Sequence, residues 1–137
     1  MITARLDKNT LVARHPVAPE DMAEAAAAGV KTIINNRPDG EESGQPTGAD
    51  IEAAAKAAGL AYQYIPVAAG FSEAQVEAMA EALLQGPALA FCRSGTRSTY
   101  LWALARARLG DEPGALLSAA ASAGYDLHPI APHLRRA

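Results

Sequence analysis

The chain has 137 residues, 50% of them hydrophobic and 20% charged, and its net charge is −3. This length fits one domain, spanning residues 1–137, that can bury a core. The charge balance gives no indication of a nucleic-acid-binding surface, and no apolar run approaches the roughly 18 residues of a membrane span. We expect no signal peptide and, with a single cysteine, no intrachain disulfide, so a cytoplasmic location is predicted.

Predicted strands and helices alternate along the chain. The strands are expected at residues 10–13, as a short edge strand, and at residues 32–35, 61–67 and 87–91. The helices are expected from Pro19 to Gly29, Thr47 to Gly59, Ser72 to about Gly86, the end of the cysteine loop to Gly110, and about Glu112 to Ala123. Gly29, Gly59, Gly86, Gly110 and Gly124 each stand where a helix should end. This order predicts an α/β fold of three layers, with a mostly parallel central sheet flanked by helices.

Three loops follow the predicted strands at one edge of that sheet. They are the loop with Arg37 and Asp39, the loop of residues 68–71, and the loop that begins at Cys92. Ligands of parallel sheets bind beyond the carboxyl ends of the strands. We therefore expect the three loops to meet at one mouth.

The loop at residues 92–98 carries the strongest chemical signal. It reads Cys92, Arg93, Ser94, Gly95, Thr96, Arg97 and Ser98. A loop that curls over a helix start directs free backbone N–H groups at an anion, and the same field lowers the pKa of a thiol. We predict Cys92 as nucleophile, Arg97 as the clamp on an oxyanion and Ser98 as a hydrogen-bond donor to the sulfur. The intervening residues, Arg93, Ser94, Gly95 and Thr96, are predicted to bind the anion. A buried, inert cysteine is the alternative.

Arg37 and Asp39 allow two interpretations. They could pair with each other and fix their own loop, or Arg37 could stand at the rim and attract an oxyanion. Glu41 and Glu42 are expected to be solvated loop charges, whereas Tyr62, Tyr64 and Trp102 are expected in the core. The three histidines form no metal-ligand pattern, so neither a metal nor a cofactor is predicted.

The cysteine loop resembles those of two enzyme families. Protein tyrosine and dual-specificity phosphatases place five residues between the cysteine and the arginine, and rhodanese-type sulfurtransferases often place four. Here four residues separate Cys92 from Arg97. Together with residues 31–42 and 61–67, the loop resembles the phosphatase-like domain of beta-lactamase-hydrolase-like proteins, from about Arg5 to about Leu134. That resemblance implies a protein-tyrosine-phosphatase-like fold carrying a cysteine loop of rhodanese length.

Loop length and a missing acid favour sulfur transfer as the leading expectation. Dual-specificity phosphatases have an aspartate upstream of the cysteine, but residues 67–72 include no carboxylate. In this interpretation Cys92 carries a persulfide between a small-molecule donor, thiosulfate or a persulfide, and a thiol acceptor. The resemblance also suggests a metallo-beta-lactamase-fold persulfide enzyme as a partner.

Two alternatives remain open at this point. The first is a cysteine-dependent phosphatase of the dual-specificity type, with Asp39 as its general acid. The second is a non-catalytic redox or anion sensor, whose exposed thiol would be oxidised reversibly.

Overall fold

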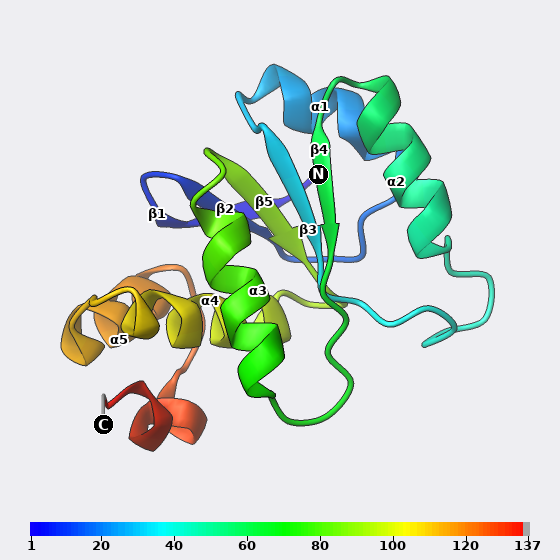
Figure 1. Cartoon of the computed structure of the whole chain (residues 1–137). Helices are drawn as coiled ribbons and strands as arrows, with labels where there is room; N and C mark the ends of the chain where they lie inside the picture. The colour runs from blue at the N-terminus through cyan, green and yellow to red at the C-terminus, as the bar shows by residue number, and fades with distance from the viewer. Residues whose placement is uncertain (136–137) are drawn as a thin grey trace.

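The computed structural model describes residues 1–135 and contains a five-stranded sheet with helices on both faces (Figure 1). The strands are β1 (Thr3–Asp7), β2 (Thr10–Ala13), β3 (Thr32–Asn35), β4 (Ala61–Tyr64) and β5 (Ala88–Phe91). Their order in the sheet is β1-β2-β5-β3-β4, and only the β1–β2 pair in this sheet is antiparallel. The predicted mostly parallel sheet of a three-layer α/β fold is therefore confirmed.

The helices lie in two layers. Their bounds are η1 (Pro19–Asp21), α1 (Met22–Ala27), α2 (Gly48–Ala57), α3 (Glu73–Leu83), α4 (Thr96–Arg108), α5 (Pro113–Ser122) and η2 (His128–Leu134). In Figure 1, α1 and α2 cover one face of the sheet, and α3, α4 and α5 lie on the other. Capping boxes begin α2, at Thr47 and Asp50, and α3, at Ser72 and Gln75, as their spacing predicts.

The sheet separates two hydrophobic cores. Successive residues of β3 point to opposite faces, so that Ile33 packs with α1 and α2 while Ile34 packs with α3 and α4. In β5, Leu89 lies on the side of Ile33, and Ala88 and Ala90 lie on the side of Ile34. The central strands are thus buried on both faces. Because β2, β5, β3 and β4 run parallel, their carboxyl ends lie at one edge of the sheet.

Several local expectations are wrong. β2 is not an edge strand, because β1 pairs along its outer side. β4 ends at Tyr64 rather than residue 67, and Pro66 follows, whose missing N–H interrupts strand pairing. Tyr64 lies on this edge strand with 40% of its surface exposed, whereas Trp102 is buried as expected.

Within residues 1–135, no helix has the length and apolar character needed to cross a membrane.

Candidate active site

Cys92 follows β5 directly and is 1% exposed. The loop turns at Gly95, which has φ of 95° and is the N-cap of α4. Glycine tolerates this left-handed conformation without steric cost. The Gly95 N–H donates a hydrogen bond to Cys92 Sγ at 3.2 Å. The sulfur therefore lies at the positive end of a 13-residue helix.

The surroundings of Cys92 favour its thiolate. Burial by itself raises the pKa of the Cys92 thiol. Hydrogen bonds from the backbone and hydroxyl of Ser98 and from the backbone N–H groups of Gly95 and Ser94 outweigh the burial, so the pKa lies below its ordinary value. The sequence-based expectation of a thiol with a lowered pKa is confirmed in direction.

Ser98 connects the cysteine to the loop after β3. Its hydroxyl donates to Asn36 Oδ1 at 2.8 Å, and it also lies within hydrogen-bonding reach of Cys92. Asn36 is fully buried and donates from Nδ2 to the Ile65 carbonyl at 2.9 Å. One hydroxyl proton thus has two acceptors, the amide oxygen and the thiolate. A polar residue directly after a fully buried strand is the signal in the sequence that indicates Asn36.

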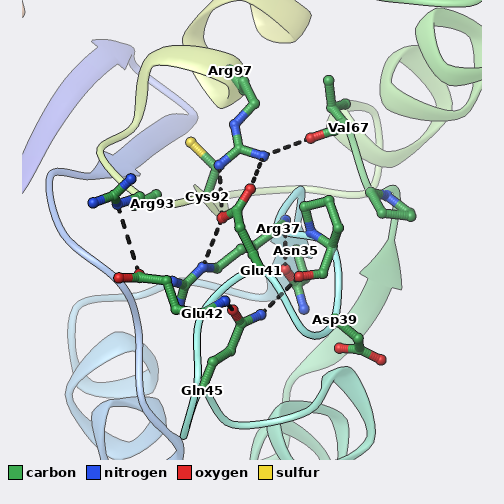
Figure 2. Close-up of polar contacts among 12 residues, drawn as sticks. Asn35, Arg37, Asp39, Glu41, Glu42, Gln45, Val67, Cys92, Arg93 and Arg97 are labelled. Carbon is green, nitrogen blue, oxygen red and sulfur yellow. Dashed lines mark hydrogen bonds and ion pairs between the residues drawn. The ribbon is translucent and has the colours of Figure 1, made fainter. Parts of the chain in front are cut away.

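Arg97 brings the three predicted loops together (Figure 2). Its Nη1 donates to the Val67 carbonyl at 2.6 Å, in the loop after β4. Its Nη2 lies 3.0 Å from Glu41 Oε1, and Nη1 lies 2.7 Å from Glu41 Oε2, in the loop after β3. The predicted common mouth is therefore confirmed for the loops that carry Glu41, Val67 and Cys92.

Glu41 and Arg97 form a mutually stabilised ion pair. The hydrogen bond from Arg97 lowers the pKa of Glu41 although burial opposes the shift, and Arg37 adds to it. In return, the hydrogen bond to Glu41 raises the pKa of Arg97, and the negative charge of Cys92 contributes further. The expectation that Glu41 is only a solvated charge is wrong, because the carboxylate orients the arginine beside the cysteine.

Arg37 pairs with the two glutamates and not with Asp39. It is 5% exposed, its Nε lies 3.0 Å from Glu41 Oε1, and its Nη2 bonds Glu42. Glu42 also reaches Arg93, with 3.7 Å between Oε1 and Nε. Arg37 therefore lies beneath the mouth as a support for the glutamates, and the interpretation that places it at the rim does not fit this burial.

Asp39 lies apart from the sulfur. Its Oδ1 accepts a hydrogen bond from the Gly48 N–H at 2.6 Å, and its own N–H donates to the Tyr64 hydroxyl at 3.0 Å. In Figure 2 the Asp39 side chain points away from Cys92. The carboxylate thus fixes the start of α2, and this geometry does not favour the expectation that it contacts an anion or acts as general acid.

The remaining residues of the cysteine loop, Arg93, Ser94 and Thr96, are exposed or half-buried. Arg93 is exposed, with 64% of its side chain accessible. The hydroxyls of Ser94 and Thr96 lie 3.3 Å apart at the surface. The structure therefore brings Ser94, Gly95, Arg97 and Ser98 to the sulfur, whereas Arg93 is exposed and pairs with Glu42.

A match to a protein-family model identifies the family of this chain. Residues 5–109 match the model of the family described as "Beta-lactamase hydrolase-like protein, phosphatase-like domain". The chain belongs to this family. A beta-lactamase hydrolase-like protein of Agrobacterium fabrum is 41% identical over 112 residues, which are 78% of this chain and 25% of the relative. The chain thus spans about a quarter of the length of that relative.

Solved structures share the fold of this chain. A crystal structure from Neisseria meningitidis, described as a "putative phosphatase", is 33% identical and superposes with a TM-score of 0.80, covering 96% of this chain and 94% of that one. PTPMT1, at 15% identity, shares the fold with a TM-score of 0.72 over 97% of this chain and 94% of its own. The protein-tyrosine-phosphatase-like fold is confirmed.

These findings correct the expectation of sulfur transfer. The family is described as phosphatase-like and the Neisseria structure as a phosphatase, so the expectation of a rhodanese-type sulfurtransferase that works through a persulfide is wrong. Loop length misleads because four intervening residues suffice to place Arg97 in the first turn of α4 and to aim the Gly95 N–H at the sulfur.

Proposed function

We propose that this chain is a cysteine-dependent phosphatase of the protein-tyrosine-phosphatase-like type. The observation that carries the proposal is the buried Cys92 thiol with a lowered pKa at the start of α4, with Arg97 beside it. A thiolate next to inward-pointing N–H groups and a guanidinium suits attack on a phosphorus atom that carries negative oxygens. The family assignment supports the same reaction class.

The reaction proceeds in two displacements. Cys92 Sγ attacks the phosphorus, the S–P bond forms, and the bond to the leaving oxygen breaks with its electron pair. Water then attacks the phosphocysteine, which releases inorganic phosphate, returns the electron pair to sulfur and gives a proton to solvent. Backbone N–H groups of the loop and the Arg97 guanidinium bind the phosphoryl oxygens, because the N–H groups of Ser94, Gly95 and Ser98 and the guanidinium already point at the sulfur.

Ser98 assists the second displacement. As the sulfur regains negative charge, the Ser98 hydroxyl turns and donates its hydrogen bond to Cys92 Sγ in place of Asn36 Oδ1. A hydrogen bond to an ionised acceptor is about twice as strong as a neutral one. The hydroxyl thereby stabilises the departing thiolate without any change in the position of α4.

Hydrolysis of p-nitrophenyl phosphate tests the proposal. Its leaving group departs as a stable anion, so the assay does not depend on a general acid. We expect turnover by the wild type and none by Cys92→Ser, with circular dichroism and thermal melting showing that the variant is folded. An inactive but folded wild-type protein, or an active Cys92→Ser variant, would contradict the proposal.

The partner stays a prediction. The Agrobacterium relative is about four times as long as the matched segment, and its name refers to beta-lactamase hydrolase. We propose that a metallo-beta-lactamase-fold enzyme acts together with this chain. Co-purification of the two proteins from cells tests this, and its failure would leave the phosphatase proposal untouched.

A further inference from the structure

Tyr125 reaches the cysteine loop from outside the segment that matches the family. It follows α5, is 9% exposed, and lies beyond residue 109, where the family match ends. Its hydroxyl donates to the Ser94 carbonyl at 2.8 Å. The Gly95 N–H, which belongs to the same peptide group as that carbonyl, donates to Cys92 Sγ at 3.2 Å.

The two hydrogen bonds act on opposite ends of one rigid unit. In a planar trans peptide the C=O and N–H point in opposite directions. A hydroxyl that holds the Ser94 oxygen on the outside therefore keeps the Gly95 N–H directed at the sulfur. Without it, the peptide is freer to flip, since Gly95 adopts positive and negative φ about equally well. The flipped peptide would turn a carbonyl oxygen toward the thiolate and destabilise it.

The close approach of Tyr125 depends on the absence of a side chain at residue 95. A Cβ built there would lie 2.2 Å from the Tyr125 hydroxyl oxygen and 2.8 Å from the Ala13 carbonyl oxygen. Both distances are below any normal contact. The glycine thus serves two purposes, the left-handed turn and the space for the tyrosine hydroxyl.

Other contacts hold the tyrosine in place. The Arg14 guanidinium lies over its ring, 5.3 Å from the centroid, and also bonds the Ala123 carbonyl. The Tyr125 N–H donates to the Ala120 carbonyl at 2.8 Å, at the end of α5. Burial raises the pKa of Tyr125, which Arg14 opposes and the charge of Cys92 reinforces, so the hydroxyl keeps its proton at neutral pH.

We infer that Tyr125 is a positioning residue that fixes the Ser94–Gly95 peptide in the orientation that stabilises the Cys92 thiolate. The inference rests on the proposed function, because it assigns Tyr125 a part in preparing the nucleophile of that reaction. A hydrogen bond to the carbonyl also polarises the peptide and strengthens its N–H as a donor. The Tyr125 hydroxyl thus affects both the direction and the strength of the hydrogen bond from the Gly95 N–H to Cys92 Sγ.

The test compares Tyr125→Phe with Tyr100→Phe. Phenylalanine keeps the ring and its packing but removes the hydroxyl. Tyr100 lies on α4 with its ring against Phe71, and within residues 1–135 its hydroxyl makes no hydrogen bond to the cysteine loop, which makes it a matched control. The readout is the rate of Cys92 alkylation by iodoacetamide as a function of pH, which reports the fraction of thiolate without any substrate turnover.

We expect the alkylation midpoint of Tyr125→Phe to move upward by about one pH unit, with the Tyr100→Phe midpoint unchanged. A lower melting temperature with an unchanged midpoint in Tyr125→Phe would overturn the inference, because a merely structural role would give that result. Equal shifts in both variants would overturn it too. If the midpoint moves while the wild type hydrolyses no p-nitrophenyl phosphate, the proposed function fails and the positioning role stands.

Discussion

Oε2 of Glu41 lies 2.7 Å from Nη1 of Arg97, although 55 residues separate the two along the chain. The contact joins the loop after β3 to the first turn of α4. The contact restrains the long Arg97 side chain in the free protein. Less conformational entropy of that side chain is therefore lost when a substrate binds. Arg97, the proposed anion-binding arginine, is therefore positioned before a substrate arrives.

Replacing Glu41 by Gln tests this positioning. The amide keeps the size of the carboxylate but removes the charge that attracts Arg97. We expect kcat/KM for p-nitrophenyl phosphate to fall by roughly 10- to 100-fold, since a misplaced guanidinium binds the transition state less well. Steady-state kinetics at several substrate concentrations provide the measurement.

Glu42→Gln is the control for that variant. Glu42 contacts Arg37 and Arg93 but not Arg97 in the described hydrogen bonds and ion pairs of residues 1–135. We expect kcat/KM of Glu42→Gln to change by about twofold or less, as is usual for partly exposed ion pairs.

A Glu41→Gln variant with a higher kcat/KM than the wild type would show that the carboxylate competes with substrate for Arg97, contrary to the account.

Ser98→Ala tests the hydroxyl next to the sulfur. Because the Ser98 hydroxyl helps to lower the pKa of Cys92, its removal should raise that pKa. A higher pKa means that the thiolate is lost at a higher pH on acidification, so the acidic limb of kcat/KM against pH should move upward by up to about one unit. Ser94→Ala, which leaves the backbone N–H in place, should leave that limb where it is. An unmoved limb in Ser98→Ala would contradict this role.

Asp39→Asn distinguishes a structural carboxylate from a general acid. The carboxylate accepts the Gly48 N–H at the start of α2, where a negative charge is favourable. We expect the free energy of unfolding to fall by about 1 kcal/mol in urea melts, while the pH profile of kcat keeps its shape. Loss of the basic limb of that profile would instead identify Asp39 as the acid.

Much of the fold could be predicted from local signals. Three of the four residues at 32–35 are β-branched, which indicates a strand, and the spacing of Ser72 and Gln75 indicates the start of α3. The run from Cys92 to Ser98 indicates a nucleophile at a helix start by composition alone. These signals are local because backbone conformation and capping depend on neighbours in the sequence.

The rest of the site depends on contacts between distant segments. Glu41 looks like any loop glutamate until the fold brings it to Arg97, and Tyr125 contacts Ser94, which lies 31 positions earlier in the chain. Asp39 is close in sequence to Arg37, yet its carboxylate lies at α2. The expectation of sulfur transfer is wrong because it depends on the loop length and on the absence of a carboxylate in residues 67–72. Neither feature determines where N–H groups and charges lie around the sulfur.

Trapping the covalent intermediate tests the central claim most directly. Wild-type protein mixed with a rapidly reacting aryl phosphate and quenched in acid should carry one phosphoryl group, about 80 Da by mass spectrometry, on the peptide that contains Cys92. Cys92→Ser should carry none. Phosphate release without any phosphocysteine, or a phosphoryl group on another residue, would contradict the account.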